Sequence, residues 1–574
     1  MPVINLDGNP TGVLHDLFMK NDFLNPGKVF AWRDMIEDLG RHLVQRYGRA
    51  TLKWRFEHWN EPMVIDKFCA DGKKTRAFGS FQSMFNYYDA CENGLARAGP
   101  GLQIGGPSTH SFDTPAPAQD ERAGEFVHDG HGHQDPFVPF LEHCDTGTNY
   151  FSNKSGTRLD FISIHRKGTF KGAPGGGNAT NILTVEREFF RVIREKHPKF
   201  LDLPFWNDEA DPISGWAKFL SWRPGPIYAA FMVSAISQHI AAMETSADGR
   251  SRIDGVPYSL ISNDNSFTGC VQLEGGYGDS FTCDPQAQPR PTWLQRTLLT
   301  TFTRTLPSGE NETKVIKKPD LTVMSLLNRL GPRRAPTQIA TAPAVKSGPG
   351  GVASIGESCT SVLLYRSDDT AMTDEPPLEI SLQISGMTGL AAENATVVQW
   401  RLDDHHGNPY QTWSDAGHPS WPTDSQMAAM EAEQEPVMIA QHAAATHPGP
   451  TRTTIELPLP AVSLVQLCRQ PLRVPATLPK PSLMSVQGNT AIVISWVASN
   501  STETLRTYVV EASSNGPNGG FVRVNKVDVI ATAWIHRWRA AGGANSPSAS
   551  ILCYRVQAID YWGRASMPSD AVCQ

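Results

Sequence analysis

Two short apolar stretches of this chain each end in a glutamate: Phe56-Glu57-His58-Trp59-Asn60-Glu61-Pro62 and Pro204-Phe205-Trp206-Asn207-Asp208-Glu209-Ala210-Asp211-Pro212. Both have strand character before the glutamate. A parallel β/α barrel carries its chemistry where the strands end and the loops begin. Hydrolysis of a glycosidic bond needs two carboxyl groups that face the same bond. We therefore expect a barrel that brings Glu61 and Glu209 together as a catalytic pair.

Strands and helices alternate around these stretches over residues 1–330. Segments of strand character lie near residues 4, 54, 104, 161, 205 and 260. Helical periodicity covers residues 29–47, 78–97, 183–196, 227–243 and 320–330. Buried strands that alternate with helices are typical of parallel β/α units. A closed TIM barrel of the (β/α)8 type has eight strands. We therefore expect an N-terminally incomplete barrel of about six units, with strand edges at residues 3–6 and 256–262.

The pattern changes after the barrel, and the chain is therefore predicted to be multidomain. Helical periodicity fades at about residue 331, and short strands follow at 361–365, 378–384, 396–400, 453–459 and 462–467. These predict a β-sandwich over 331–475, interrupted by a polar stretch at 403–450. A Pro-rich linker spans 471–481. The strands 491–496 and 554–560 then predict a fibronectin type III-like domain over 476–574.

Composition narrows the class of protein. The 574 residues carry a net charge of −7, which argues against a nucleic-acid partner bound through phosphate contacts. No apolar run reaches the roughly 18 residues of a spanning helix, and the first residues lack the basic region and apolar core of a signal peptide. Sequons for N-glycans occur at Asn153, Asn178, Asn311, Asn394 and Asn500.

A loop rich in His, Asp and Pro covers about residues 108–135. His128, His131 and His133 could bind a metal ion, but nothing in the pattern fixes them as ligands, so a solvated loop is favoured. The nine Cys residues show no zinc-finger spacing. We expect no metal and no cofactor.

Motifs in a fixed order carry a resemblance to a known family. They are Trp59-Asn60-Glu61-Pro62, Ile164-His165-Arg166-Lys167-Gly168, Asn207-Asp208-Glu209-Ala210-Asp211-Pro212, Ser262-Asn263-Asp264-Asn265, Ser367-Asp368-Asp369-Thr370 and Ala558-Ile559-Asp560-Tyr561-Trp562. Over about residues 25–574 the chain resembles the animal α-L-iduronidases, which are lysosomal retaining glycosidases. The resemblance implies a barrel, a β-sandwich and a fibronectin-like domain. It also implies hydrolysis of terminal α-L-iduronic acid from the glycosaminoglycans dermatan sulfate and heparan sulfate, in the lysosome.

The resemblance also implies roles for single residues. Glu61 would be the general acid/base and Glu209 the nucleophile, with Asn60 bonded to the sugar 2-hydroxyl. Asp208 is expected on the other face of its strand from Glu209, because side chains alternate along a strand. Further substrate contacts are expected from Lys167 and Arg296 to the uronate carboxylate, from the backbone N–H groups of Gly215 and Trp216, and from Asp264 to sugar hydroxyls.

Other interpretations of these residues stay open. Glu61 could be a buried strand-end acid paired with Arg or Lys, Lys167 and Arg296 could form ordinary barrel salt bridges, and Asp264 could be a structural cap. His165 could equally contact substrate or be a satisfied core residue.

Two features depart from the family and leave rival functions open. The family has two more β/α units before the region that matches residues 3–8, so we expect this chain to start inside the barrel. Residues 266–292 form a longer loop, whose Cys270 and Cys283 could pair as a disulfide. The rivals are another retaining barrel glycosidase, such as a β-xylosidase, and a catalytically inactive homologue that binds glycan.

Overall fold

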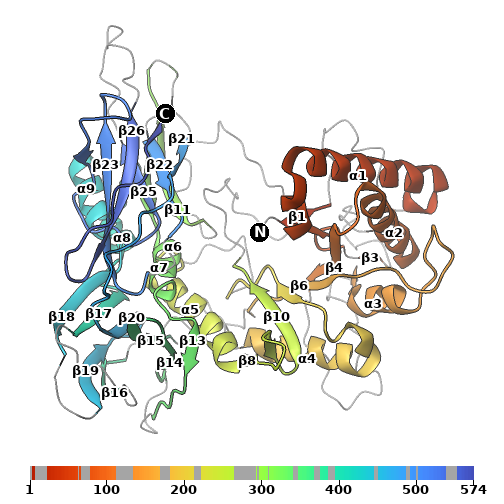
Figure 1. Cartoon of the computed structure of the whole chain (residues 1–574), viewed down its shortest axis with the longest axis horizontal. Helices are drawn as coiled ribbons and strands as arrows, with labels where there is room; N and C mark the ends of the chain where they lie inside the picture. The colour runs from red at the N-terminus through yellow and green to blue at the C-terminus, as the bar shows by residue number, and fades with distance from the viewer. Residues whose placement is uncertain are drawn as a thin grey trace. The chain divides into compact units, whose positions relative to one another are not determined.

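A computed structural model describes most of the chain (Figure 1). The described residues are 3–6, 22–62, 64–65, 78–110, 133–168, 181–212, 222–263, 293, 297–307, 309, 311–340, 347–367, 375–384, 395–444, 450–485, 491–498, 502–537 and 552–574. The chain divides into two compact units. The first contains residues 1–169, 180–212 and 241–264, and the second contains residues 170–179, 213–240 and 265–574.

The first unit is organised around six parallel strands in one sheet. Their order is β1 (Val3–Asn5), β2 (Arg55–Glu57), β4 (Gln103–His110), β6 (Phe161–His165), β7 (Phe205–Asn207) and β10 (Val256–Ile261). All six predicted barrel strands are confirmed. Because the strands are parallel, their carboxyl ends meet at one edge of the sheet, and the residues that follow them lie close together.

One predicted edge of this sheet is wrong. Residues 256–262 were expected to be unpaired, but β9 (Ser251–Ile253) pairs with β10 in antiparallel fashion and β8 (Glu244–Thr245) extends the sheet further. The cause is the turn at Asp254 and Gly255, whose φ angles of 49° and 87° are both positive. An Asp-Gly pair of this kind favours a tight hairpin.

Helices α1 (Pro26–Tyr47), α2 (Phe81–Ala98), α3 (Phe137–Asp145) and α4 (Asn181–Lys196) complete the first unit, with a two-stranded ribbon of β3 (Val64–Ile65) and β5 (His133–Gln134). Short 3-10 turns lie at Asp22–Leu24, Gly48–Lys53 and Pro198–Phe200. The sequence predicted α1, α2 and α4 but not α3. The Asn25 side chain caps α1 by accepting from the Gly27 N–H, and Pro26 occupies its first turn, as helix starts favour.

The second unit begins with α5 (Pro226–Ala242), predicted at 227–243. Its Ala229, Ala230 and Val233 are buried in one core with residues of the sandwich. The hairpin of β11 (Leu299–Thr305) and β12 (Asn311–Lys317) follows. The helix predicted at 320–330 is present but broken into two short helices, α6 (Pro319–Thr322) and α7 (Met324–Leu327). Ser325 donates from its hydroxyl to the Thr322 carbonyl, which competes with a continuous helical ladder.

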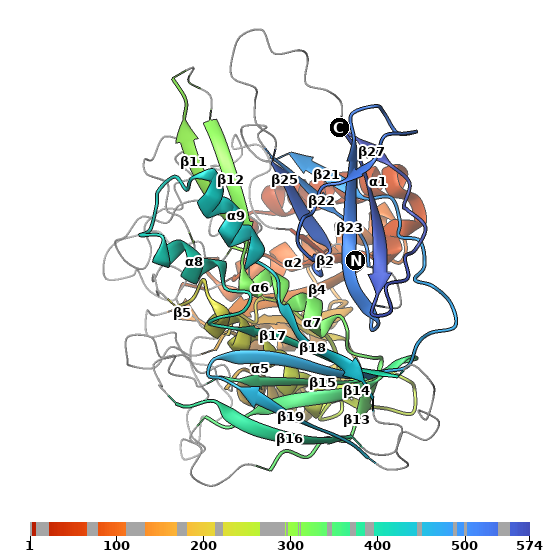
Figure 2. The same cartoon turned by 90° about the vertical axis from the view of Figure 1, so that its left-hand side faces the viewer.

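An antiparallel sandwich forms the centre of the second unit. One sheet contains β13 (Arg333–Ala335), β14 (Gly350–Ile355), β15 (Cys359–Arg366), β20 (Ala461–Cys468), β17 (Thr396–Asp403) and β18 (Val437–Ala443). Against it lies the pair of β16 (Leu378–Ile384) and β19 (Thr451–Leu457) (Figure 2). The layers meet through buried Val362, Val397, Leu457 and Val465. The polar stretch within the sandwich forms α8 (Pro409–Asp415) and α9 (Asp424–Ala432).

Two small antiparallel sheets end the chain. One contains β21 (Ser482–Ser485), β22 (Ala491–Ser495) and β25 (Ala533–Arg537), and the other contains β24 (Val522–Arg523), β23 (Leu505–Ser513), β26 (Cys553–Asp560) and β27 (Val572–Cys573). Ile494, Trp496, Tyr508 and Val556 are buried between them. The fibronectin type III assignment, the domain limits near 330 and 475 and the incompleteness of the barrel stay predictions.

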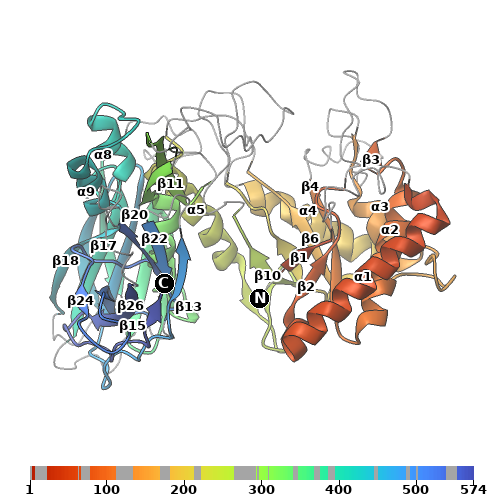
Figure 3. The same cartoon turned by 90° about the horizontal axis from the view of Figure 1, so that it is seen from above.

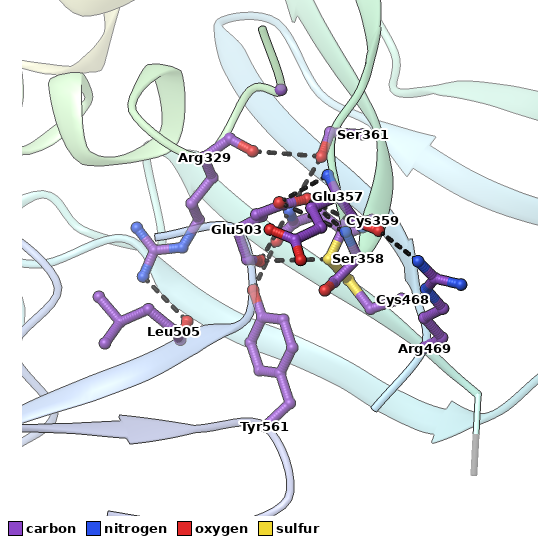
Figure 4. The surroundings of a disulfide bond; sticks show 12 residues. Arg329, Glu357, Ser358, Cys359, Ser361, Cys468, Arg469, Glu503, Leu505 and Tyr561 are labelled. Carbon is purple, nitrogen blue, oxygen red and sulfur yellow. Dashed lines mark hydrogen bonds between the residues drawn. A yellow bond between two sulfur atoms is a disulfide. The ribbon is translucent and has the colours of Figure 1, made fainter. Parts of the chain in front are cut away.

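A carboxylate joins the small sheets to the sandwich, next to a disulfide that lies within the sandwich (Figure 4). Glu503 accepts hydrogen bonds from the backbone N–H groups of Glu357 and Cys359 at 2.9 and 2.8 Å. Cys359 is bonded to Cys468 across β15 and β20. A second disulfide joins Cys553 to Cys573. A carboxylate that accepts several N–H groups holds a turn firmly. Glu503, just before β23, therefore fixes the turn between β14 and β15.

Helices α1 and α2 approach each other closely (Figure 3), and glycine makes this possible. A Cβ atom on Gly94 would lie 2.5 Å from the Arg33 carbonyl oxygen. We expect Gly94→Ala to lower the thermal midpoint of unfolding measured by calorimetry. Overpacking costs about 1–3 kcal/mol, which exceeds the gain of up to about 1 kcal/mol in helix propensity.

The matched control for this substitution is Gly99→Ala, directly after α2. A Cβ there meets only Val44 Cγ2, at an ordinary distance of 3.7 Å. Equal midpoints for the two variants would contradict a helix contact limited by Gly94.

Candidate active site

Glu61 is held in an unusual backbone conformation just after β2. Its φ is 47°, a region that costs free energy for residues other than glycine. Its N–H donates to the Ser108 carbonyl oxygen at 3.0 Å, and Ser108 itself has a φ of 56°. The Glu61 side chain is 27% exposed. The neighbouring strand β4 therefore fixes the turn that presents this carboxylate.

His165 ends β6 and lies between the two predicted catalytic residues. Its side chain is buried, and Nδ1 lies 3.0 Å from Glu61 Oε1 and 3.4 Å from Glu209 Oε2. Its other nitrogen, Nε2, lies 3.0 Å from Ser108 Oγ and 3.7 Å from Asp208 Oδ1. The sequence left the role of His165 open. The structure places it against both carboxylates.

The charges around His165 decide its protonation. Burial opposes the imidazolium, but the charge of Glu209, the hydrogen bond with Glu61 and the charge of Asp208 outweigh this cost and raise the pKa of His165 to about 9. His165 is therefore a cation at neutral and acidic pH. It offsets the repulsion between carboxylates that crowd the same site.

Asp208 and Glu209 both approach this imidazole ring, from its two nitrogens. They face different ring nitrogens, but strand alternation is not the cause, because β7 ends at Asn207 and the two acids lie in the following turn. Alternation applies only while the backbone stays extended.

Glu209 forms an ion pair with Lys167. Lys167 Nζ lies 2.5 Å from Glu209 Oε2, and the side chains are 4% and 19% exposed respectively. A salt bridge at Lys167 was one of the open interpretations, and the structure shows such a bridge with the predicted nucleophile itself. The contact restrains the Glu209 carboxylate and places a positive charge at the centre of the site.

The two glutamates are close together. Ligand atoms of Glu61, His165 and Glu209 all lie within 4.8 Å of one another. Retaining glycosidases hold their two carboxyl groups about 5–5.5 Å apart, whereas inverting enzymes need about 6.5–9.5 Å. The same three atoms could in geometry hold a metal ion. The ammonium of Lys167, 2.5 Å from Glu209 Oε2, opposes a cation there.

Asn207 joins the ends of the strands that carry the site, a role that the sequence did not reveal. It is fully buried, accepts from the Arg166 N–H at 3.0 Å and donates to the Arg166 carbonyl at 2.8 Å. It also donates to Glu186 at 2.6 Å, and Glu186 accepts from the Tyr258 hydroxyl at 3.0 Å. This network holds β6, β7 and β10 in register beside the carboxylates.

The remaining predicted residues are only partly within the described structure. Asn60 precedes Glu61 and is half-buried. Of the sequons, Asn153 is exposed and Asn311 begins β12. None of the helices in the described ranges has the length and apolarity to cross a membrane. Outside the described residues lie Gly215, Trp216, Asp264, Arg296, Cys270, Cys283, His128, His131, the side chain of His133, Asn178, Asn394 and Asn500.

The raised pKa of His165 has a consequence for stability. The unfolded chain loses this proton near pH 6.5 and the folded chain near pH 9, so the stabilising contribution is complete below about pH 6.5 and is lost as the pH rises towards 9. This contribution is on the order of 3 kcal/mol. We expect the thermal midpoint of the parent to fall over this window, and that of His165→Gln to fall less. Parallel curves for the two proteins would show that His165 is not a buried cation.

Comparison with known proteins agrees with this geometry. The profile of glycosyl hydrolases family 39 matches residues 2–449, and that of the α-L-iduronidase C-terminal domain matches residues 482–574. The α-L-iduronidase of Homo sapiens is 32% identical over 96% of this chain and 76% of its own length, and that of Mus musculus is 29% identical over 100% and 80%.

A solved structure of the bacterial orthologue of human α-L-iduronidase has the same fold, with a TM-score of 0.74 and 24% identity over 100% of this chain and 84% of that one. The family profile covers most of the chain, and the human relative is 32% identical along nearly all of it. Both observations assign the chain to a family by its sequence, and the shared fold agrees with this assignment. The chain therefore belongs to glycosyl hydrolases family 39.

Proposed function

We propose that this chain is a retaining glycosidase that removes terminal α-L-iduronic acid from dermatan sulfate and heparan sulfate. The observation that carries the proposal is the pair of carboxylates, Glu61 and Glu209, within 4.8 Å of each other. Relatives named α-L-iduronidase, similar along nearly the whole chain, support the choice of sugar.

Double displacement assigns a different task to each glutamate. Ionised Glu209 attacks the anomeric carbon and forms a covalent glycosyl-enzyme, while Glu61 donates a proton to the departing oxygen. Water then enters, Glu61 removes a proton from it, and the attack of this water releases iduronic acid and restores Glu209. Lys167 holds Glu209 in place for the first step, and His165 contacts the side chains of both glutamates.

A uronic acid brings a third carboxylate into the site. It needs cationic or N–H partners, because burying an unpaired charge is costly. Lys167 supplies one buried ammonium. The resemblance adds Arg296 and the backbone N–H groups of Gly215 and Trp216, with Asn60 and Asp264 for the hydroxyl groups.

The resemblance also supports a lysosomal location and N-glycans at the sequons. Asn153 is exposed, as an acceptor must be. We further infer a fibronectin type III class for residues 476–574, on the basis of its two small sheets.

The function is tested with aryl α-L-iduronides. Glu209→Gln should abolish turnover of every such substrate, because the nucleophile is lost. Glu61→Gln should slow a poor leaving group by about 10²- to 10⁴-fold and a dinitrophenyl leaving group far less, since only the former needs protonation. NMR of the first product formed should show retained configuration.

Glu195→Gln on α4 is the matched control, since this glutamate is 54% exposed and paired with Arg191. It should keep full activity. Faster hydrolysis of an aryl β-xyloside by the parent would favour the xylosidase alternative. Equal losses on both leaving groups would remove Glu61 from the acid role.

Lys167 is tested with two sugars that differ in one group. Lys167→Ala should weaken kcat/KM for an aryl α-L-iduronide more than for the aryl α-L-idoside, which carries a neutral hydroxymethyl group in place of the carboxylate. The additional loss should correspond to about 1–3 kcal/mol, as for a hydrogen bond to a charged group. The same loss on both sugars would mean that Lys167 acts only through Glu209.

A further inference from the structure

Three buried oxygen atoms lie behind His165 without an ordinary hydrogen-bond donor. They are Glu57 Oε1, Asp208 Oδ1 and Ser163 Oγ, and within the described part of the chain none makes a hydrogen bond of ordinary distance and angle, although Asp208 Oδ1 lies 3.7 Å from His165 Nε2. They come from the end of β2, the turn after β7 and the middle of β6. Glu57 is 3% exposed and Ser163 is fully buried. Buried polar atoms are normally paired, so this cluster needs an explanation.

A proton between the two acids supplies the missing donor. The Glu57 carboxyl lies beside the Asp208 carboxyl and the Ser163 hydroxyl, and both neighbours act on the pKa of Glu57. Two ionised carboxylates only accept, whereas a protonated one donates. Burial, followed by the charge of Asp208, raises the pKa of Glu57 well above its usual value. The other Glu57 oxygen accepts from Asn5 Nδ2 at 3.5 Å.

The ionisable groups around His165 then divide into two sides. Glu61 and Glu209 face Nδ1, and Lys167 offsets part of the Glu209 charge. Asp208 faces Nε2 at 3.7 Å, with Glu57 behind it and neutral Ser108 at 3.0 Å. The charge that Asp208 retains therefore acts on His165 from the side away from the catalytic carboxylates.

We infer that Glu57 and Asp208 share one proton, and that the single negative charge left on this pair keeps His165 an imidazolium between Glu61 and Glu209. Glu57 and Asp208 are positioning residues in this scheme. Its catalytic meaning rests on the proposed function, because His165 Nδ1 lies 3.0 Å from an oxygen of Glu61, the residue that must deliver a proton to the departing oxygen. Loss of that proton sets the alkaline limit of activity.

The test reads His165 directly by NMR of protein labelled at the histidine Cε1 carbon, with the signal assigned through His165→Gln. Asp208→Asn should lower the pKa of His165 by about one to three pH units, because a charge within about 4–6 Å is removed. The alkaline limb of kcat/KM should move down equally. Glu57→Gln should change neither, because its amide donates to Asp208 as the protonated acid does.

Asp145→Asn is the matched control. Asp145 Oδ2 lies 3.0 Å from His197 Nδ1, so the same substitution beside another histidine should leave the His165 titration unchanged. The inference is overturned if Asp208→Asn does not move the titration of His165. It is also overturned if Glu57→Gln lowers it as much as Asp208→Asn does, since both acids would then be ionised.

Infrared spectroscopy gives a second readout that does not need the Asp208 variant to fold. The parent at neutral pH should show a protonated carboxyl C=O band that disappears in Glu57→Gln, and its absence from the parent would refute the shared proton. Neither titration nor infrared band depends on turnover. Absence of iduronidase activity would therefore refute the proposed function. The shared proton would still be tested by the His165 titration and the infrared band.

Discussion

The site depends on one electrostatic constraint: two carboxylates within 4.8 Å must be held together in a partly buried place. Two ionised carboxylates this close repel each other. His165 and Lys167 oppose this repulsion from buried positions, His165 between the two acids and Lys167 against Glu209. The ends of the strands hold these two cations where the carboxylates meet.

The parallel sheet makes such a cluster possible from distant parts of the chain. Glu61 follows β2, Ser108 lies in β4, His165 ends β6, and Glu209 follows β7. Neighbouring strands are about 4.8 Å apart, so residues at their ends fall within contact distance without long loops. Asn207 adds the side-chain bonds that fix the relation of β6 to β7. The precision of the site therefore comes from the rigid strands.

Most of the frame was predictable from the sequence, because buried strands and amphipathic helices leave strong periodic patterns. The six parallel strands and the two glutamates followed from such patterns. The β8–β9 hairpin, α3 and the break between α6 and α7 did not, since they depend on turn residues and side-chain bonds rather than on periodicity. The contact of Lys167 with Glu209 was also beyond sequence reasoning, because it depends on side-chain direction at two strand ends.

The pKa of His165 determines which group can act as a pH sensor here. A histidine that titrates at about 9 stays charged from acidic to neutral pH, so it cannot switch activity in that range. A fall in activity on acidification must then come from a group that needs to be ionised, and in the proposed mechanism that group is Glu209. Lys167 Nζ lies 2.5 Å from Glu209 Oε2 and restrains this carboxylate through an ion pair.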